Sequence, residues 1–316
     1  MLAIIIIIGL SLIGGQLARK VGLPVVVGQL LTGIVIGPAI FNIVQTTHWV
    51  HLLAELGVWL LMFMAGLETD MAGLQKNAKP AVGVAILGVV VPLIVFYGTA
   101  LFFGYSQMTA VFFGIVFSAT SISITIAVLG EFGKLGSRAG NIILGAAVLD
   151  DVLAMALVGF FMIFTPGQGL GPTTLLPIVF FVVGILINRF TKINFQMVEK
   201  IGNWTLIPLF FGSLGLVVTF DNLVKNWPMV IAFAVFALGT KYYGALIGSR
   251  MTGVNPNDSQ VVALGMIPRG EMALIIAQIG ITGSVINAAI FSDMVIIILI
   301  STVLPPILLR YALKKV

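Results

Sequence analysis

Long apolar runs separated by short polar connections dominate the chain. Runs of about 17 to 25 apolar residues are typical of transmembrane helices. Eleven such runs are present, at 2–18, 23–43, 50–67, 80–103, 108–130, 140–164, 172–190, 203–222, 226–249, 257–280 and 288–313. The connections between them are too short to form a separate soluble domain. The pattern therefore predicts an all-α polytopic membrane protein with about eleven transmembrane helices in a lipid bilayer.

The composition supports this class and excludes several others. Hydrophobic residues make up 59% of the 316 residues, charged residues only 9%, and the mean hydropathy is +1.17, whereas soluble domains carry about 25% charged residues. The absence of Cys excludes disulfides and thiol catalysis, and two His are too few for a His-rich metal centre. No GxxxxGK[ST], HExxH or GxSxG motif is found. We expect neither an enzyme nor a bound cofactor.

The basic residues predict the orientation. If the N-terminus is outside, the connections after odd-numbered spans and the C-terminus face the cytoplasm. These segments hold thirteen of the 16 basic residues: Arg19, Lys20, Lys76, Lys79, Lys134, Arg138, Arg189, Lys192, Lys200, Arg250, Arg310, Lys314 and Lys315. Such an excess is what the positive-inside rule requires. We predict a multi-pass protein of the cell membrane with a cytoplasmic C-terminus. Because the basic residues are scattered, no nucleic-acid partner is expected.

Two adjacent carboxylates lie deep in an apolar span. Asp150 and Asp151 come about ten residues into the run 140–164, roughly 15 Å along a helix. A charge at the bilayer centre costs about 2.5 to 3.5 kcal/mol and usually has a function. The alternative, that the pair lies in a loop, is disfavoured by the apolar and small residues on both sides. Because neighbouring helix positions differ by about 100°, one carboxylate can bind a partner while the other faces a cavity.

A lysine in another span is the obvious counter-ion. Arg250 marks the cytoplasmic end of the run 226–249, and Lys241 lies nine residues before it. Nine residues correspond to roughly 13 Å, further than a lysine side chain reaches comfortably by snorkelling. We therefore favour pairing with the carboxylates over snorkelling.

Two spans carry polar interruptions. One contains Ser118, Thr120, Ser121 and Ser123, in "FSATSISITIAVLG", and the other contains Pro268, Arg269, Gly270 and Glu271, in "GMIPRGEMALIIAQIG". Ser and Thr alone are weak indications, because they often hydrogen-bond back along a helix. Interrupted helices in corresponding positions of two halves, however, indicate an ion site near the midplane, toward which the helix ends direct partial charges.

Together these segments resemble the cation/proton antiporter superfamily, within its second family, and in particular the bacterial NapA-type sodium/proton antiporters. The matching motifs are "VGLPVVVGQLLTGIVIGP", "LAELGVWLLMFMAGLE", "SATSISITIAVL", "ILGAAVLDDVLA", "IPLFFGSLGL" and "GMIPRGEMALIIAQIG". They follow the family's order over nearly the whole chain. Most are loose individually, but the Asp pair, the mid-helix Lys and the PRGE motif together are highly specific.

The resemblance implies an elevator-type exchanger with an inverted-repeat fold and two unwound crossing helices, usually a homodimer. It places dimerisation or scaffold helices at 1–49 and 165–225, and the ion-transport core at 50–164 and 226–316. It matches the ion-binding carboxylate, which alternately holds Na⁺ and a proton, to Asp151. It also implies a salt bridge between Asp150 and Lys241. The crossing unwound helices would be those that contain Thr120–Ser123 and Pro268–Glu271.

The sequence departs from the family in its length. Family members usually have twelve or thirteen helices, and two of them normally stand between "IVFFVVGILINRF" and "TLIPLFFGSLGL". We predict that two helices are missing near 190–203, which leaves the second repeat incomplete.

The resulting functional hypothesis is a sodium (or lithium)/proton antiporter that exchanges cytoplasmic Na⁺ for external H⁺ by alternating access. One alternative is a potassium/proton antiporter. The other is a shortened family member that does not transport.

Overall fold

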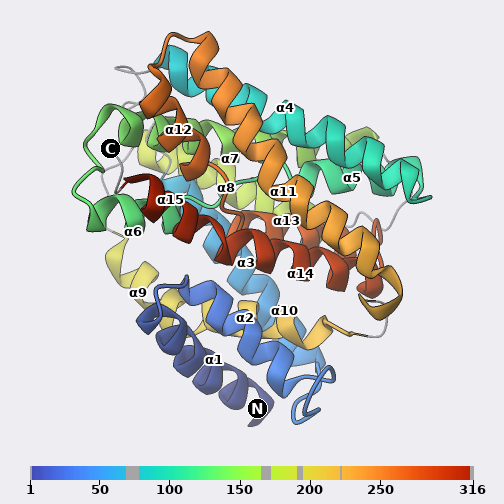
Figure 1. Cartoon of the computed structure of the whole chain (residues 1–316). Coiled ribbons are helices and arrows are strands. Elements are labelled where there is room, and N and C mark those ends of the chain that lie inside the picture. The colour runs from blue at the N-terminus through green and yellow to red at the C-terminus, as the bar shows by residue number, and fades with distance from the viewer. Residues whose placement is uncertain (1, 69–77, 165–171, 191–194, 221–222, 314–316) are drawn as a thin grey trace. The chain divides into compact units, whose positions relative to one another are not determined.

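The computed structural model is helical throughout the part of the chain that it describes, which is all residues except 1, 69–77, 165–171, 191–194, 221–222 and 314–316. The helices in chain order (Figure 1) are α1 (Leu2–Lys20), α2 (Val25–Ile36), α3 (His48–Glu68), α4 (Ala78–Phe102), α5 (Gln107–Val116), α6 (Ser123–Glu131), α7 (Arg138–Phe164), α8 (Pro172–Phe190), α9 (Gln196–Trp204), α10 (Leu206–Val217), α11 (Leu223–Met251), α12 (Pro256–Gly265), α13 (Glu271–Thr282), α14 (Ala288–Val303) and α15 (Pro305–Leu313).

Every one of the eleven predicted spans contains helix. Among the described residues, six helices or helix pairs are long and apolar enough to cross a membrane, namely α1, α3, α4, α7, α11 from Asn226, and α14 with α15. Two predicted spans are each divided into two helices, 108–130 into α5 and α6 and 257–280 into α12 and α13. The predicted interruptions of these two spans are therefore confirmed.

Two features differ from the predicted spans. The span 288–313 changes from α14 to α15 at Leu304, because Pro305 and Pro306 lack the N–H groups that would continue the hydrogen bonding of α14. The short helix α9 was not predicted, because its sequence "QMVEKIGNW" is too polar to read as a span. It ends at Trp204, just before α10 begins.

The chain divides into two compact units. Unit 1 comprises 1–69, 169–225 and 287–292, and unit 2 comprises 70–168, 226–286 and 293–316. The sequence groups α3 with the ion-transport core, whereas the structure places it in unit 1. The assignment of transport and dimerisation roles to parts of the chain stays a prediction.

Unit 1 is packed through glycines that bring helix backbones together. A Cβ atom on Gly28 of α2 would lie 2.1 Å from the carbonyl oxygen of Gly14 in α1, and one on Gly33 would lie 2.0 Å from that of Gly212 in α10. In the same way, a Cβ on Gly66 of α3 would lie 2.2 Å from the carbonyl oxygen of Phe181 in α8. Small residues at helix contacts are how membrane helices gain close van der Waals packing.

Unit 2 combines glycine contacts with an apolar and aromatic core. Helices α4 and α11 approach at Gly83 and Gly248, where a Cβ on Gly248 would lie 2.4 Å from the Gly83 carbonyl oxygen. The rings of Phe96 and Phe117 stack with centroids 4.4 Å apart, and Phe233 of α11 packs against Phe96 at 5.3 Å. Phe117 directly follows α5, so this aromatic packing adjoins the first helix interruption.

Candidate ion-binding site

The two interrupted helices of unit 2 meet at their interruptions. The backbone N–H of Ser121 donates to the carbonyl oxygen of Pro268 over 2.8 Å, and the Ser121 hydroxyl donates to Glu271 Oε2 over 2.8 Å. The Thr125 hydroxyl donates to the carbonyl oxygen of Gly265 over 2.6 Å. Unwound backbone at membrane depth must find such partners within the protein. Each interruption therefore satisfies polar groups of the other.

Local sequence explains where the chain unwinds. Pro268 has no N–H group and disfavours helical geometry at Ile267. Gly270 precedes α13 in an extended conformation, and a Cβ there would lie 2.7 Å from the Ser121 side chain. A larger residue than glycine would therefore separate the two interruptions.

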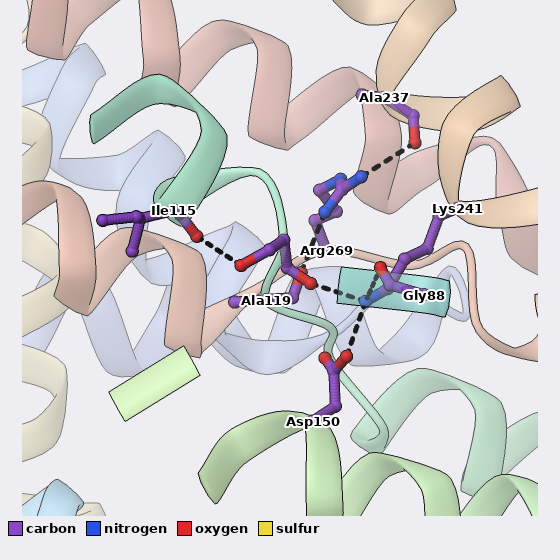
Figure 2. Close-up of polar contacts among 8 residues, drawn as sticks. Gly88, Ile115, Ala119, Asp150, Ala237, Lys241 and Arg269 are labelled. Carbon is purple, nitrogen blue, oxygen red and sulfur yellow. Dashed lines mark hydrogen bonds and ion pairs between the residues drawn. The ribbon is translucent and has the colours of Figure 1, made fainter. Parts of the chain in front are cut away.

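Lys241 reaches the same region from the middle of α11. Its side chain is fully buried, and its ammonium donates to Asp150 Oδ1 over 2.7 Å, to the Gly88 carbonyl oxygen over 2.9 Å and to the Ser118 carbonyl oxygen over 2.5 Å (Figure 2). A lysine ammonium has three N–H donors. All three are used, so Lys241 joins α4, α7 and the interruption after α5.

The two neighbouring aspartates of α7 are placed differently. The Asp150 side chain is fully buried in an ion pair with Lys241, and its second oxygen, Oδ2, has no hydrogen-bond partner in the described structure. Asp151 is only half-buried. The Lys241 ammonium lies within electrostatic range of both carboxylates. The ion pair between Asp150 and Lys241 is thus present, while the adjacent carboxylate is more accessible.

Arg269 supplies a second buried cation. Its guanidinium donates to the carbonyl oxygens of Ala119, over 3.0 Å, and Ala237, over 3.1 Å (Figure 2). Its central carbon also lies 5.8 and 5.9 Å from the ring centres of Phe117 and Phe96, within the range of cation–π attraction. No carboxylate of the described residues forms an ion pair with it. Arg269 therefore holds both interruptions and α11 through backbone carbonyls.

Most of the predicted site residues come together here, with some differences in what they contribute. Ser118 contributes its backbone carbonyl oxygen, which accepts from Lys241. Its hydroxyl instead donates to the carbonyl oxygen of Ile115 over 2.7 Å. Thr120 is buried, and its hydroxyl has no hydrogen-bond partner in the described structure. Ser123 begins α6, but its side chain lies outside the described part of the structure.

The sequence did not reveal two contributors to this site. The Gly88 carbonyl is one, because a backbone oxygen has no signature in the amino-acid sequence. Thr302 of α14 is the other, and its hydroxyl donates to the carbonyl oxygens of Arg269 and Ile298. A threonine in an apolar helix usually forms only the second kind of bond, so nothing marked Thr302.

Comparison with known proteins places this site in a family. The family described as "Sodium/hydrogen exchanger, transmembrane" matches residues 4–197 and 177–315. A Na(+)/H(+) antiporter of Enterococcus hirae is 33% identical over 366 positions, which cover 96% of this chain and 95% of that protein. The Na(+)/H(+)-K(+) antiporter GerN of Bacillus cereus is 32% identical, over 95% of this chain and 92% of that protein.

A solved structure shows the same fold. The sodium proton antiporter MjNhaP1 from Methanocaldococcus jannaschii, determined at pH 8, superimposes with a TM-score of 0.68 and 15% identity, over 98% of this chain and 97% of that chain.

The alignments also bear on the length of the chain. The alignment to the Enterococcus hirae protein has 366 positions, whereas this chain has 316 residues, so at least 50 positions hold no residue of this chain. The two segments matched by the family overlap at 177–197, and this overlap includes part of the predicted gap at 190–203. Residues 191–194 lie outside the described structure. That the difference amounts to two helices stays a prediction.

The family match spans nearly the whole chain, and the residues of the site lie within the matched segments. The chain belongs to the sodium/hydrogen exchanger family, and it is therefore a membrane transporter of cations and protons rather than an enzyme.

Proposed function

We propose that this protein exchanges cytoplasmic Na⁺, or Li⁺, for external H⁺ by alternating access, and that Asp151 is the carboxylate that binds them in turn. The observation that carries the proposal is the contrast between the two aspartates. Asp150 is fully buried in an ion pair with Lys241, whereas Asp151, next to it on α7, is half-buried and lies within electrostatic range of the same ammonium.

The charged side chains of the candidate site, taken together, support the transport of one cation per cycle. Lys241 and Arg269 supply two positive charges, while Asp150, Asp151 and Glu271 supply three negative charges when all are ionised. The region then has one excess negative charge, which a single Na⁺ or proton neutralises. A buried net charge is costly, so the loaded state is favoured for movement through a desolvated environment.

Competition at one carboxylate is sufficient for exchange. Desolvation disfavours the bare anion of Asp151, so it holds either a proton or a small cation. Na⁺ is a hard cation that prefers oxygen ligands. Hydroxyl groups such as that of Thr120, which has no hydrogen-bond partner among the described residues, together with water, complete its coordination. Raising the cytoplasmic pH deprotonates Asp151 and favours Na⁺ binding from that side.

The proposal also includes the orientation of the protein in the membrane and its oligomeric state. The positive-inside pattern supports an external N-terminus and a cytoplasmic C-terminus in the cell membrane. The resemblance to elevator-type exchangers supports a homodimer, with unit 2 as the moving part.

Potassium/proton exchange is the second candidate. The name of GerN, one of the most similar relatives, includes K⁺ as well as Na⁺, and a K(+)/H(+) antiporter of Saccharomyces cerevisiae is 23% identical over 88% of this chain.

Reconstitution into liposomes with a trapped pH dye tests the proposal. We expect Na⁺ and Li⁺ pulses to move protons through the wild-type protein, and Asp151→Asn to abolish this flux. Asp258→Asn is the matched control, because Asp258 lies in the first turn of α12, where its Oδ2 accepts a hydrogen bond from the Asn255 side-chain amide and its backbone N–H donates to Asn255 Oδ1.

The other outcomes are decisive as well. Proton flux that responds equally to K⁺ would favour the second candidate. Wild-type flux in Asp151→Asn would exclude Asp151 as the ion-binding carboxylate. No flux from a folded, monodisperse wild-type protein would show that the shortened chain does not transport.

A further inference from the structure

A second fully buried carboxylate among the described residues of unit 2 takes no part in the contacts described above. Asp293 is in the second turn of α14, which begins at Ala288, and only 1% of its surface is exposed. The side-chain amide of Asn226, in α11, donates to Asp293 Oδ2 over 3.2 Å. The other oxygen, Oδ1, has no hydrogen-bond partner in the described structure.

The groups around Asp293 do not neutralise it. Within the described residues no Lys, Arg or His forms an ion pair with it. Tyr105, in the connection between α4 and α5, is the titratable side chain recorded within its electrostatic range. The Tyr105 hydroxyl points to a different partner, because it donates to Met229 Sδ over 3.0 Å.

Tyr105 is also not the group that exchanges protons here. Its burial, together with the negative charge of Asp293, raises the pKa of the Tyr105 hydroxyl to about 12. The phenol therefore keeps its proton throughout the physiological range. Any proton gained or lost in this cluster belongs to Asp293.

Asp293 contrasts with Asp150 in what stabilises it. Asp150 is buried against the Lys241 ammonium, whereas Asp293 receives one hydrogen bond from a neutral amide. An ionised carboxylate that is excluded from water and has no cationic partner is strongly disfavoured, and it lowers its free energy by binding a proton.

We propose that Asp293 is a second proton-binding site of this transporter, separate from Asp151. Asp293 takes up and releases protons at the end of unit 2 where the α4–α5 connection, the start of α14 and Asn226 of α11 lie. In the orientation expected from the basic residues, this is the external end. The site follows from the contacts of Asp293 alone. Its use in delivering external protons rests on the proposed antiport function.

Infrared spectroscopy of the reconstituted protein tests the site without transport. A protonated buried carboxyl gives a resolved C=O band, which we expect to titrate with pH in the wild-type protein. The band should be lost in Asp293→Asn and kept in Asp151→Asn and in the control Asp258→Asn. A band unaffected by Asp293→Asn in a folded protein would overturn the proposal.

A second variant should extend the pH range of the carboxyl band rather than remove the band. Asn226→Leu removes the donor that stabilises the carboxylate, so the same band should persist to higher pH than in the wild type. A carboxyl that only fills space would be unaffected by this change. If the band instead disappears at lower pH, Asn226 does not stabilise the ionised form and the assignment fails.

Transport separates the site from its use. With internal pH fixed and external pH varied, Asp293→Asn should shift the external pH dependence of Na⁺-driven flux, while Asp258→Asn should leave it unchanged. An unchanged profile would overturn the role in external proton delivery. If the wild-type protein shows no flux, the antiport proposal fails, whereas the infrared result still decides whether Asp293 binds a proton.

Discussion

The two units differ in what they bury. In the described residues of unit 1, the buried polar side chains are uncharged: Ser11, Gln29, Ser213 and Ser292. The buried charged side chains all belong to unit 2: Asp150, Lys241, Arg269 and Asp293. Both units therefore contain close backbone packing, but among the described residues only unit 2 also depends on how buried charges are satisfied.

This difference implies two kinds of sensitivity. Where a glycine lets two helix backbones touch, there is no space for a side chain, so adding one carbon atom forces the helices apart. A buried charge loses its compensation when its partner is removed, but removing both partners of a pair can be nearly neutral. Single charge substitutions should therefore be costly in unit 2 alone, and unit 2 should tolerate some double charge substitutions better than single ones.

The largest expected effect is that of breaking the buried ion pair of unit 2. Lys241→Met keeps the length of the side chain but leaves Asp150 buried without its cation and three acceptors without a donor. Removing one partner of a buried pair costs about 3 to 5 kcal/mol. We expect a corresponding loss of thermal stability, measured by the unfolding temperature in detergent.

The double variant Lys241→Met with Asp150→Asn sharpens this test. It removes both charges, so it should recover most of the lost stability even though exchange activity need not return. If the double variant is as unstable as Lys241→Met alone, the bonds from Lys241 to the Gly88 and Ser118 carbonyls, rather than the ion pair, hold this part of unit 2.

A moderate effect is expected from a glycine contact of unit 1. In Gly28→Ala the new Cβ would lie 2.1 Å from the Gly14 carbonyl oxygen, so α1 and α2 must move apart, at a cost of about 1 to 3 kcal/mol. Gly9→Ala, also in unit 1, is the matched control because no atom lies within 4 Å of its Cβ position. Equal unfolding temperatures for the two variants would contradict the packing argument.

The sequence predicted the part of the site that depends on unusual residues. Asp150 and Lys241 are conspicuous because charges are costly in an apolar span, and Pro268 and Gly270 because they interrupt a helix. The Gly88 carbonyl and the back-bonding Thr302 could not be found this way, since their contribution depends on which helices pack together. Asp293 lies only six residues into its predicted span, 288–313, where an acidic residue is typical of a helix boundary.

The fold was predictable for the same physical reason. A span must match the thickness of the bilayer, so long apolar runs predict helices, and each of the eleven predicted runs contains helix in the described structure. Helix α9 was missed because its residues are polar enough to resemble a connection. Helix α3 falls in unit 1 rather than with the helices that the resemblance groups it with, because its sequence carries no local signal that tells which neighbouring helices it packs against.

The smallest effect is expected where a charge pair of unit 2 lies at its surface. Arg310 of α15 donates to Glu131 of α6 through two bonds, Nε to Oε2 over 3.1 Å and Nη2 to Oε1 over 3.0 Å, but their side chains are 34% and 51% exposed. Water and salt screen such a pair, which contributes about 0 to 1 kcal/mol. Glu131→Gln should therefore leave the unfolding temperature nearly unchanged, and any small difference should vanish at high salt. A loss as large as that of Lys241→Met would show that charge pairing stabilises unit 2 regardless of burial, and that the contrast with unit 1 does not depend on desolvation.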